Sequence, residues 1–124
     1  MAHVLVIEDD GAVQNLFGQL LEGEGYTVSH ATDGAEGMRL LKQHKTDLVI
    51  TDIMMPEMDG LEVIRATRET HPGLPVIAIS GGMRAVPINF LPHAKKFGAC
   101  RVFEKPVVLA DLLAAVKELL IKPA

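Results

Sequence analysis

Acidic side chains stand directly after two apolar runs of the chain. Glu8, Asp9 and Asp10 follow the first of these runs, and Asp52 ends another. Carboxylates brought to one place repel one another, which either raises a pKa or recruits a cation. Because only oxygen ligands are on offer, a hard ion such as Mg²⁺ fits best and keeps coordination positions for phosphate oxygens. We therefore predict a Mg²⁺ site that includes Asp9 and Asp52, with Mn²⁺ as an alternative ion, whereas Asp10 is expected to cap a helix.

A lysine and a serine end two further apolar runs. Lys105 could pair with Asp52 at rest and with a phosphoryl oxygen afterwards. The Ser80 hydroxyl could donate to a phosphoryl oxygen, and the two glycines after it would let the backbone approach a ligand. A cis peptide bond before Pro106 would fix the direction of the lysine. Taken singly, these residues have plainer interpretations, namely a surface lysine and a Ser-Gly-Gly turn.

Two kinds of segment alternate along the chain and would position these residues. Five are short and strand-like, at residues 4–7, 26–31, 48–51, 76–79 and 101–103. Five are expected to be helical, at residues 13–21, 35–44, 61–70, 91–97 and 109–121. The alternation predicts a doubly wound α/β domain with five helices, and the continuous apolar runs predict a five-stranded parallel sheet. The carboxyl ends of such strands meet at one edge, so the acids, Ser80 and Lys105 should converge there.

Composition narrows the class of protein. The chain has 124 residues, 48% of them hydrophobic, which is enough for one domain with its own core. We expect a single domain spanning residues 1–124 and no separate output domain. The single cysteine, Cys100, fits a reducing cytoplasm, and it lies in an apolar run that we expect to be a buried strand. The net charge of -4, without a basic tract, argues against direct nucleic-acid binding. Neither a signal peptide nor a membrane-spanning stretch is recognisable, so we expect a soluble cytoplasmic protein.

Taken together, four motifs closely resemble the receiver domains of bacterial two-component response regulators. They are a first strand with the acidic pair after it at residues 4–10, the phosphoacceptor-like segment LVITDIMMPEMDG at 48–60, Ala-Ile-Ser at 78–80 and Phe-Glu-Lys-Pro at 103–106. The resemblance covers nearly the whole chain. It implies a flavodoxin-like fold with strand order 2-1-3-4-5, of the stand-alone chemotaxis-regulator-like type.

The resemblance also implies a role for each residue at the sheet edge. Asp52 would be the nucleophile that becomes an aspartyl phosphate. Asp9 would bind Mg²⁺ directly, Glu8 through water, and the backbone carbonyl of Met54 would be a further ligand. Ser80 would bond the phosphoryl group in the active state, and Lys105 would pair with a phosphoryl oxygen.

The implied activity is a switch rather than conventional enzymatic turnover. The phosphoryl donor would be a phosphohistidine on a sensor histidine kinase or a histidine phosphotransfer protein. The domain would catalyse its own phosphorylation and dephosphorylation at Asp52, since phosphoryl transfer needs mainly positioning and charge neutralisation. The phosphorylated domain would bind a downstream protein, with no direct role for nucleic acid or membrane.

The sequence departs from the family in the region expected to report phosphorylation. Val102 occupies the position three before Lys105, where Tyr or Phe is usual. Phe103 should point to the opposite side of the strand, so it is a poor substitute. The stretch between Ser80 and Lys105 is longer than usual and contains two prolines. We therefore expect an unusual readout of the switch.

Three other functions remain open from the sequence. A degenerate receiver could act as a constitutive protein-interaction module, although the site residues are intact. A metal-dependent aspartyl phosphatase would need a second Asp two residues after Asp52, where Met54 stands. A nucleotide or flavin binder is disfavoured because no dinucleotide fingerprint is present. None of the five histidines has metal-ligand spacing, so none is assigned chemistry.

Overall fold

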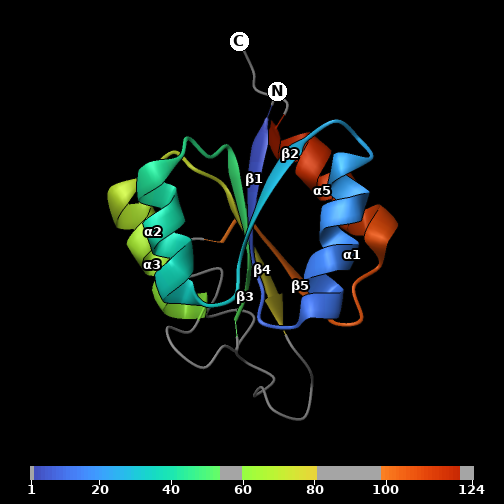
Figure 1. Ribbon diagram of the computed structural model, residues 1–124, viewed down its shortest axis with the longest axis horizontal. Helices are drawn as coiled ribbons and strands as arrows, with labels where there is room; N and C mark the ends of the chain where they lie inside the picture. The colour runs from blue at the N-terminus through green and yellow to red at the C-terminus, as the bar shows by residue number, and fades with distance from the viewer. Residues whose placement is uncertain (1, 54–59, 81–98, 121–124) are drawn as a thin grey trace.

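Five parallel strands form the centre of the molecule (Figure 1). The structure is a computed structural model that describes residues 2–53, 60–80 and 99–120. Its strands are β1 (His3–Ile7), β2 (Thr27–Ala31), β3 (Leu48–Asp52), β4 (Val76–Ser80) and β5 (Arg101–Glu104). They lie in the order β2-β1-β3-β4-β5, and every neighbouring pair is parallel. The predicted doubly wound sheet and its strand order are confirmed.

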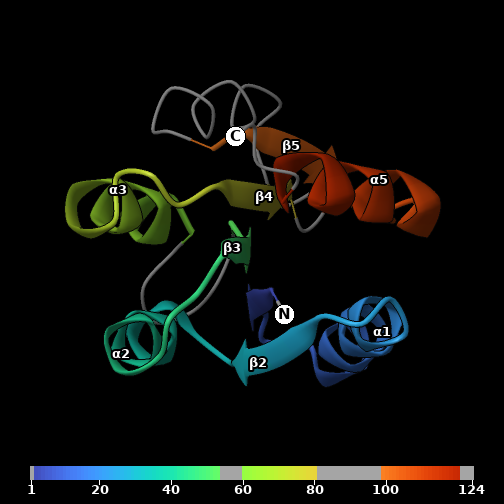
Figure 2. The ribbon, with the colours of Figure 1, turned by 90° about the horizontal axis from the view of Figure 1, so that it is seen from above.

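Helices cover both faces of the sheet. In the described part of the chain they are α1 (Gly11–Glu22), α2 (Gly34–Gln43), α3 (Gly60–Thr70) and α5 (Leu109–Leu120). Figure 2 shows α1 and α5 together on one face and α2 and α3 on the other. Four of the five predicted helices are thereby confirmed, and the one expected at residues 91–97 lies outside the described residues.

The alternation of side chains along each strand builds one hydrophobic cluster on each face of the sheet. In β1, Leu5 and Ile7 belong to the cluster under α2 and α3, whereas Val4 and Val6 belong to the cluster under α1 and α5. All four side chains are buried. Burial on both faces explains why the strands are continuous apolar runs.

The last strand, β5, is less buried than the sequence suggested. It is an edge strand paired only with β4, and its residues are half-buried or exposed. Cys100 immediately precedes it and is half-buried, so the prediction of a buried strand at this cysteine was wrong. Val102 packs with the cluster under α2 and α3, and Phe103 with the cluster under α1 and α5. This confirms that the two side chains point to opposite sides.

Parallel pairing brings the carboxyl ends of the strands to one edge. In the registers between neighbouring strands, Ile7 pairs with Thr51, and Asp52 pairs with Ile79. At the start of α1, the Asp10 carboxylate accepts hydrogen bonds from the backbone N–H groups of Ala12 and Val13, at 2.9 and 3.3 Å. The predicted helix cap is confirmed.

Among the described helices, none combines the length and the apolarity that a membrane crossing requires.

Candidate functional site

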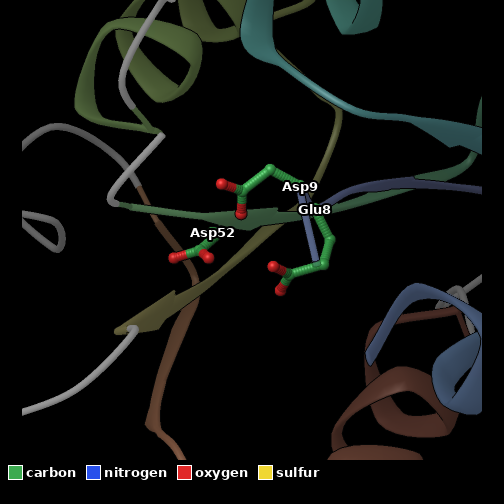
Figure 3. Close-up of side chains that lie close together, drawn as sticks. All are labelled: Glu8, Asp9 and Asp52. Carbon is green, nitrogen blue, oxygen red and sulfur yellow. The ribbon is translucent and has the colours of Figure 1, made fainter. Parts of the chain in front are cut away.

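Three carboxylates meet where β1 and β3 end (Figure 3). One oxygen from each of Glu8, Asp9 and Asp52 lies within 4.8 Å of the other two. The Glu8 and Asp52 side chains are buried, at 2% and 4% exposure, whereas Asp9 is exposed. The predicted convergence of the acids is therefore observed, and the cluster is open to solvent on the side of Asp9.

Lys105 reaches into this cluster from the segment after β5. Its Nζ lies 3.2 Å from Oδ2 of Asp52 and 2.9 Å from Oε1 of Glu8. The expected pairing with Asp52 is present, and the pairing with Glu8 is an addition that the sequence did not suggest. The peptide bond between Lys105 and Pro106 is cis.

The charges of the cluster alter its proton affinities. Burial raises the pKa of Glu8 to about 7, and the nearby charge of Asp52 adds to this effect, while Lys105 opposes it. For Lys105, burial would lower the pKa, but its hydrogen bond to Glu8 and the charges of Asp52 and Glu8 together raise it. One ammonium thus faces three carboxyl groups, and the site favours a further cation.

The donor set fits a hard divalent ion. All three candidate ligands are carboxylates, which suit Mg²⁺, Ca²⁺ or Mn²⁺ and do not suit softer metals. Glu8 is held in place by the Asp10 N–H, which donates to its Oε2 at 3.1 Å. The Glu8 N–H in turn donates to the carbonyl of Ala31, at 2.9 Å. The end of β2 therefore holds the backbone of Glu8, the residue before Asp9, in place.

The other two predicted site residues are Ser80 and Met54, and only the backbone of Ser80 is described. The backbone of Ser80 ends β4 and pairs with Glu104, which puts it at the same sheet edge as Asp52. Its side chain is not among those described. Met54, whose carbonyl was expected to bind the metal, lies outside the described residues.

Comparison with known proteins agrees with this geometry. A family model described as the response regulator receiver domain matches residues 4–117. The chain belongs to this family. Receiver domains act as phosphoacceptors, bind Mg²⁺ at an acidic pocket, and interact with histidine kinases or phosphotransfer proteins.

Individual relatives differ greatly in length. The chain is 36% identical over 121 residues to the response regulator receiver protein CpdR of Brucella abortus (strain 2308), and the match covers 98% of both. It is 37% identical over 123 residues to the sensor kinase CckA of the same strain, where it covers 98% of this chain and only 13% of CckA. The chain thus corresponds to a small part of some relatives and to nearly all of others.

A solved receiver domain has the same fold. The CheY-like receiver domain protein from Methanospirillum hungatei JF-1 superposes with a TM-score of 0.89 at 30% sequence identity. The alignment covers 97% of this chain and 94% of that one. The likeness extends over the sheet and its helices and supports the receiver fold derived above.

Proposed function

We propose that Asp52 accepts a phosphoryl group from a phosphohistidine in a Mg²⁺-dependent reaction. The observation that carries the proposal is the buried Asp52 carboxylate, which lies within ion-pair distance of Lys105 and beside two further acids. An Asp52 oxygen would attack phosphorus as the phosphorus–nitrogen bond of the phosphohistidine breaks. The histidine nitrogen leaves with the electron pair and takes up a proton, and Asp52 becomes an acyl phosphate.

The residues around Asp52 would position the metal ion and neutralise the charge of the phosphoryl oxygens. Asp9 would hold Mg²⁺ directly, Glu8 through water, and the Met54 carbonyl would add a ligand. When bound, the ion supplies positive charge to the phosphoryl oxygens. Lys105 can exchange its carboxylate partner for a phosphoryl oxygen with little movement, because its Nζ already lies 3.2 Å from Asp52. The Ser80 hydroxyl would bond the phosphoryl group of the activated domain.

The phosphorylated domain would act as a switch in a phosphorelay. We place it in the cytoplasm, with a sensor histidine kinase or a histidine phosphotransfer protein as donor and a further protein as downstream partner. Residues 1–124 would work as one receiver domain. Hydrolysis of the acyl phosphate would reset it, so that the domain catalyses its own modification and demodification without conventional turnover.

An apolar hollow beside the site offers a surface for the donor protein. It has a volume of about 180 Å³ and is lined by Val13, Leu16, Phe17, Lys105, Pro106, Val107 and Leu109. Leu16 is 46% exposed, and the neighbouring Val108 is 59% exposed. Lys105 thus belongs both to the hollow and to the acidic cluster. A donor that brings a phosphohistidine to Asp52 would cover this surface.

A constitutive interaction module is the second candidate. It is favoured by Val102, which packs in the core under α2 and α3 where the family usually has an aromatic side chain. Such a module would bind its partner without phosphorylation. The two candidates differ in whether Asp52 can be modified at all.

The deciding experiment is the intact mass of the protein after incubation with acetyl phosphate or phosphoramidate, with and without Mg²⁺. Wild type should gain one phosphoryl group only with Mg²⁺, and Asp52→Asn should gain none. Asp111→Asn, at an exposed position in the first turn of α5, is the matched control and should behave like wild type. A folded wild type that stays unmodified with every donor would refute the phosphoacceptor and favour the constitutive module.

A further inference from the structure

The side chain of Gln14 joins the ends of β1 and β2 from helix α1. Its Nε2 lies 3.1 Å from the carbonyl oxygen of Glu8 and 3.2 Å from the carbonyl oxygen of Ala31. Both neighbours are acceptors, so the amide nitrogen with its two hydrogens must face them. Gln14 therefore uses both of its side-chain donors on the backbone at the edge of the site.

The backbone of Gln14 holds the same short segment at a second point. Its N–H donates to the carbonyl of Asp10, at 2.9 Å, as the first hydrogen bond of α1. The residue thus contacts the chain on both sides of Asp9, at Glu8 through the side chain and at Asp10 through the backbone. The segment Glu8-Asp9-Asp10 is therefore joined to helix α1 by Gln14 at both of its ends.

The orientation of Asp9 depends on this backbone. Within the described part of the chain, the Asp9 carboxylate makes no hydrogen bond or ion pair, and the side chain is exposed. The Glu8 carbonyl belongs to the same peptide plane as the Asp9 N–H. A hydrogen bond that holds this plane places the N and Cα atoms of Asp9 and so restricts the directions open to its side chain.

We propose that Gln14 is a positioning residue for the Mg²⁺ site, acting through the Glu8–Asp9 peptide. The proposal rests on the function proposed above and assigns part of the metal affinity to a residue that does not touch the metal. Partners of this kind, one step removed from the ligands, typically change metal affinity by about 10- to 100-fold when they are removed. The amide should therefore matter for the Mg²⁺ concentration that the reaction needs.

The test compares Gln14→Glu with Asn15→Asp. Gln14→Glu keeps the shape of the side chain but replaces the donors by oxygens that repel the two carbonyls. Asn15→Asp makes the same change of amide to carboxylate at the next, exposed position of α1. Mg²⁺ affinity is measured by titration calorimetry of the unphosphorylated proteins. The Mg²⁺ dependence of acetyl phosphate labelling is then measured for each.

Gln14→Glu should weaken Mg²⁺ binding about tenfold relative to Asn15→Asp. The Mg²⁺ concentration for half-maximal labelling should rise by a similar factor, while the rate at saturating Mg²⁺ falls much less. Equal Mg²⁺ affinities for the two variants, with wild type binding normally, would overturn the positioning role alone. Failure of wild type to bind Mg²⁺ or to be labelled would instead count against the proposed function. If Gln14→Glu does not fold, Gln14→Ala takes its place, with the same expected direction.

Discussion

The ammonium group of Lys105 lies closer to Glu8 than to Asp52, at 2.9 Å against 3.2 Å. The lysine is thus shared between Glu8, an acid of the proposed metal site, and the proposed phosphoacceptor. Binding of a cation at the acids would compete with Lys105 for Glu8, and this would release the lysine toward Asp52. The ion pair would therefore couple metal binding to the position of Lys105, the group proposed to meet the phosphoryl oxygens.

Removal of the Lys105 charge should slow phosphorylation and spare metal binding. Lys105→Gln should reduce the rate of labelling by acetyl phosphate roughly 10²-fold, the usual effect of deleting one group that stabilises charge in the transition state. Mg²⁺ affinity should stay the same or rise, because the acids lose a competing cation. Lys117→Gln is the control, since Lys117 is an exposed residue of α5 paired with Glu24. A variant that labels at the wild-type rate would contradict the assigned role.

The stability of the metal-free protein should fall as pH rises from about 5 to 7. The pKa of Glu8 is raised from 4.5 to about 7, so the folded state keeps a proton that the unfolded state releases. That stabilisation is complete below the unfolded pKa and is lost as pH passes through the folded pKa. Urea unfolding of wild type and Glu8→Gln at several pH values isolates the effect. A pH slope that is unchanged in Glu8→Gln would assign it to other groups.

Mg²⁺ affinity should rise with pH between about 6 and 8. The proposed site needs Glu8 as a carboxylate to attract the ion, and burial raises the pKa of Glu8 to about 7 in the metal-free protein. From pH 6 to pH 8 the dissociation constant should fall about tenfold, as expected for one group of this pKa. Calorimetric titration at each pH measures it, and in Glu8→Gln the dependence should largely disappear.

The sequence was sufficient for most of the fold and for part of the site. The positions of the central strands β1, β3 and β4 were correct within a residue because buried parallel strands are continuous apolar runs. Helix α1 begins at Gly11 rather than at residue 13, since Asp10 sets the start while the apolar pattern begins only at Val13. The predicted strands also placed Asp52 and Lys105 at the same edge of the sheet, because each residue stands at or just after the end of an apolar strand segment.

Side-chain partners that depend on packing could not be read from the chain. The ion pair between Glu8 and Lys105 requires the burial of Glu8, which arises only when the strands and α1 assemble. The contacts of Gln14 with two strand ends likewise join positions distant in the sequence, and a single glutamine in a helix gives no pattern that signals them. The exposure of β5 depends on its place at the edge of the sheet.

Loss of the cap at α1 should cost stability but not specific chemistry. Asp10→Ala removes the acceptor for two N–H groups and should lower the free energy of unfolding by about 1 kcal/mol. Asp10→Asn retains a capping oxygen and should lose much less. Urea unfolding measures both variants. A loss in Asp10→Asn as large as in Asp10→Ala would show that the negative charge, rather than the cap, is what counts.

Tight packing between α2 and β1 should make an alanine at Gly37 destabilising. A Cβ on Gly37 would lie 2.4 Å from Cδ1 of Ile7, whereas a Cβ on Gly11 would meet nothing within 4 Å. Gly37→Ala should therefore destabilise the protein by about 1–3 kcal/mol despite the better helix propensity of alanine. Gly11→Ala should be nearly neutral. Denaturation midpoints of the two variants provide the comparison, and equal values would contradict the packing argument.

The apolar hollow should matter for a protein donor and not for a small one. Leu16→Lys places a charge on its exposed wall and should slow phosphotransfer from a phosphorylated histidine phosphotransfer protein at least tenfold. Labelling by acetyl phosphate should not change. Gln19→Lys, on the same helix but outside the hollow, is the control. If both donors slow equally, the substitution disturbs the site rather than the docking surface.

Strand β3 is buried along its whole length, and Asp52 is its last residue. The strand is therefore constrained by the folding of the domain, since almost any change along it disturbs a hydrophobic cluster. On the side of Asp9, which is exposed, the surroundings of Asp52 are less constrained by packing. Substitutions on this exposed side could therefore change the lifetime of the proposed acyl phosphate, while β3 stays the same.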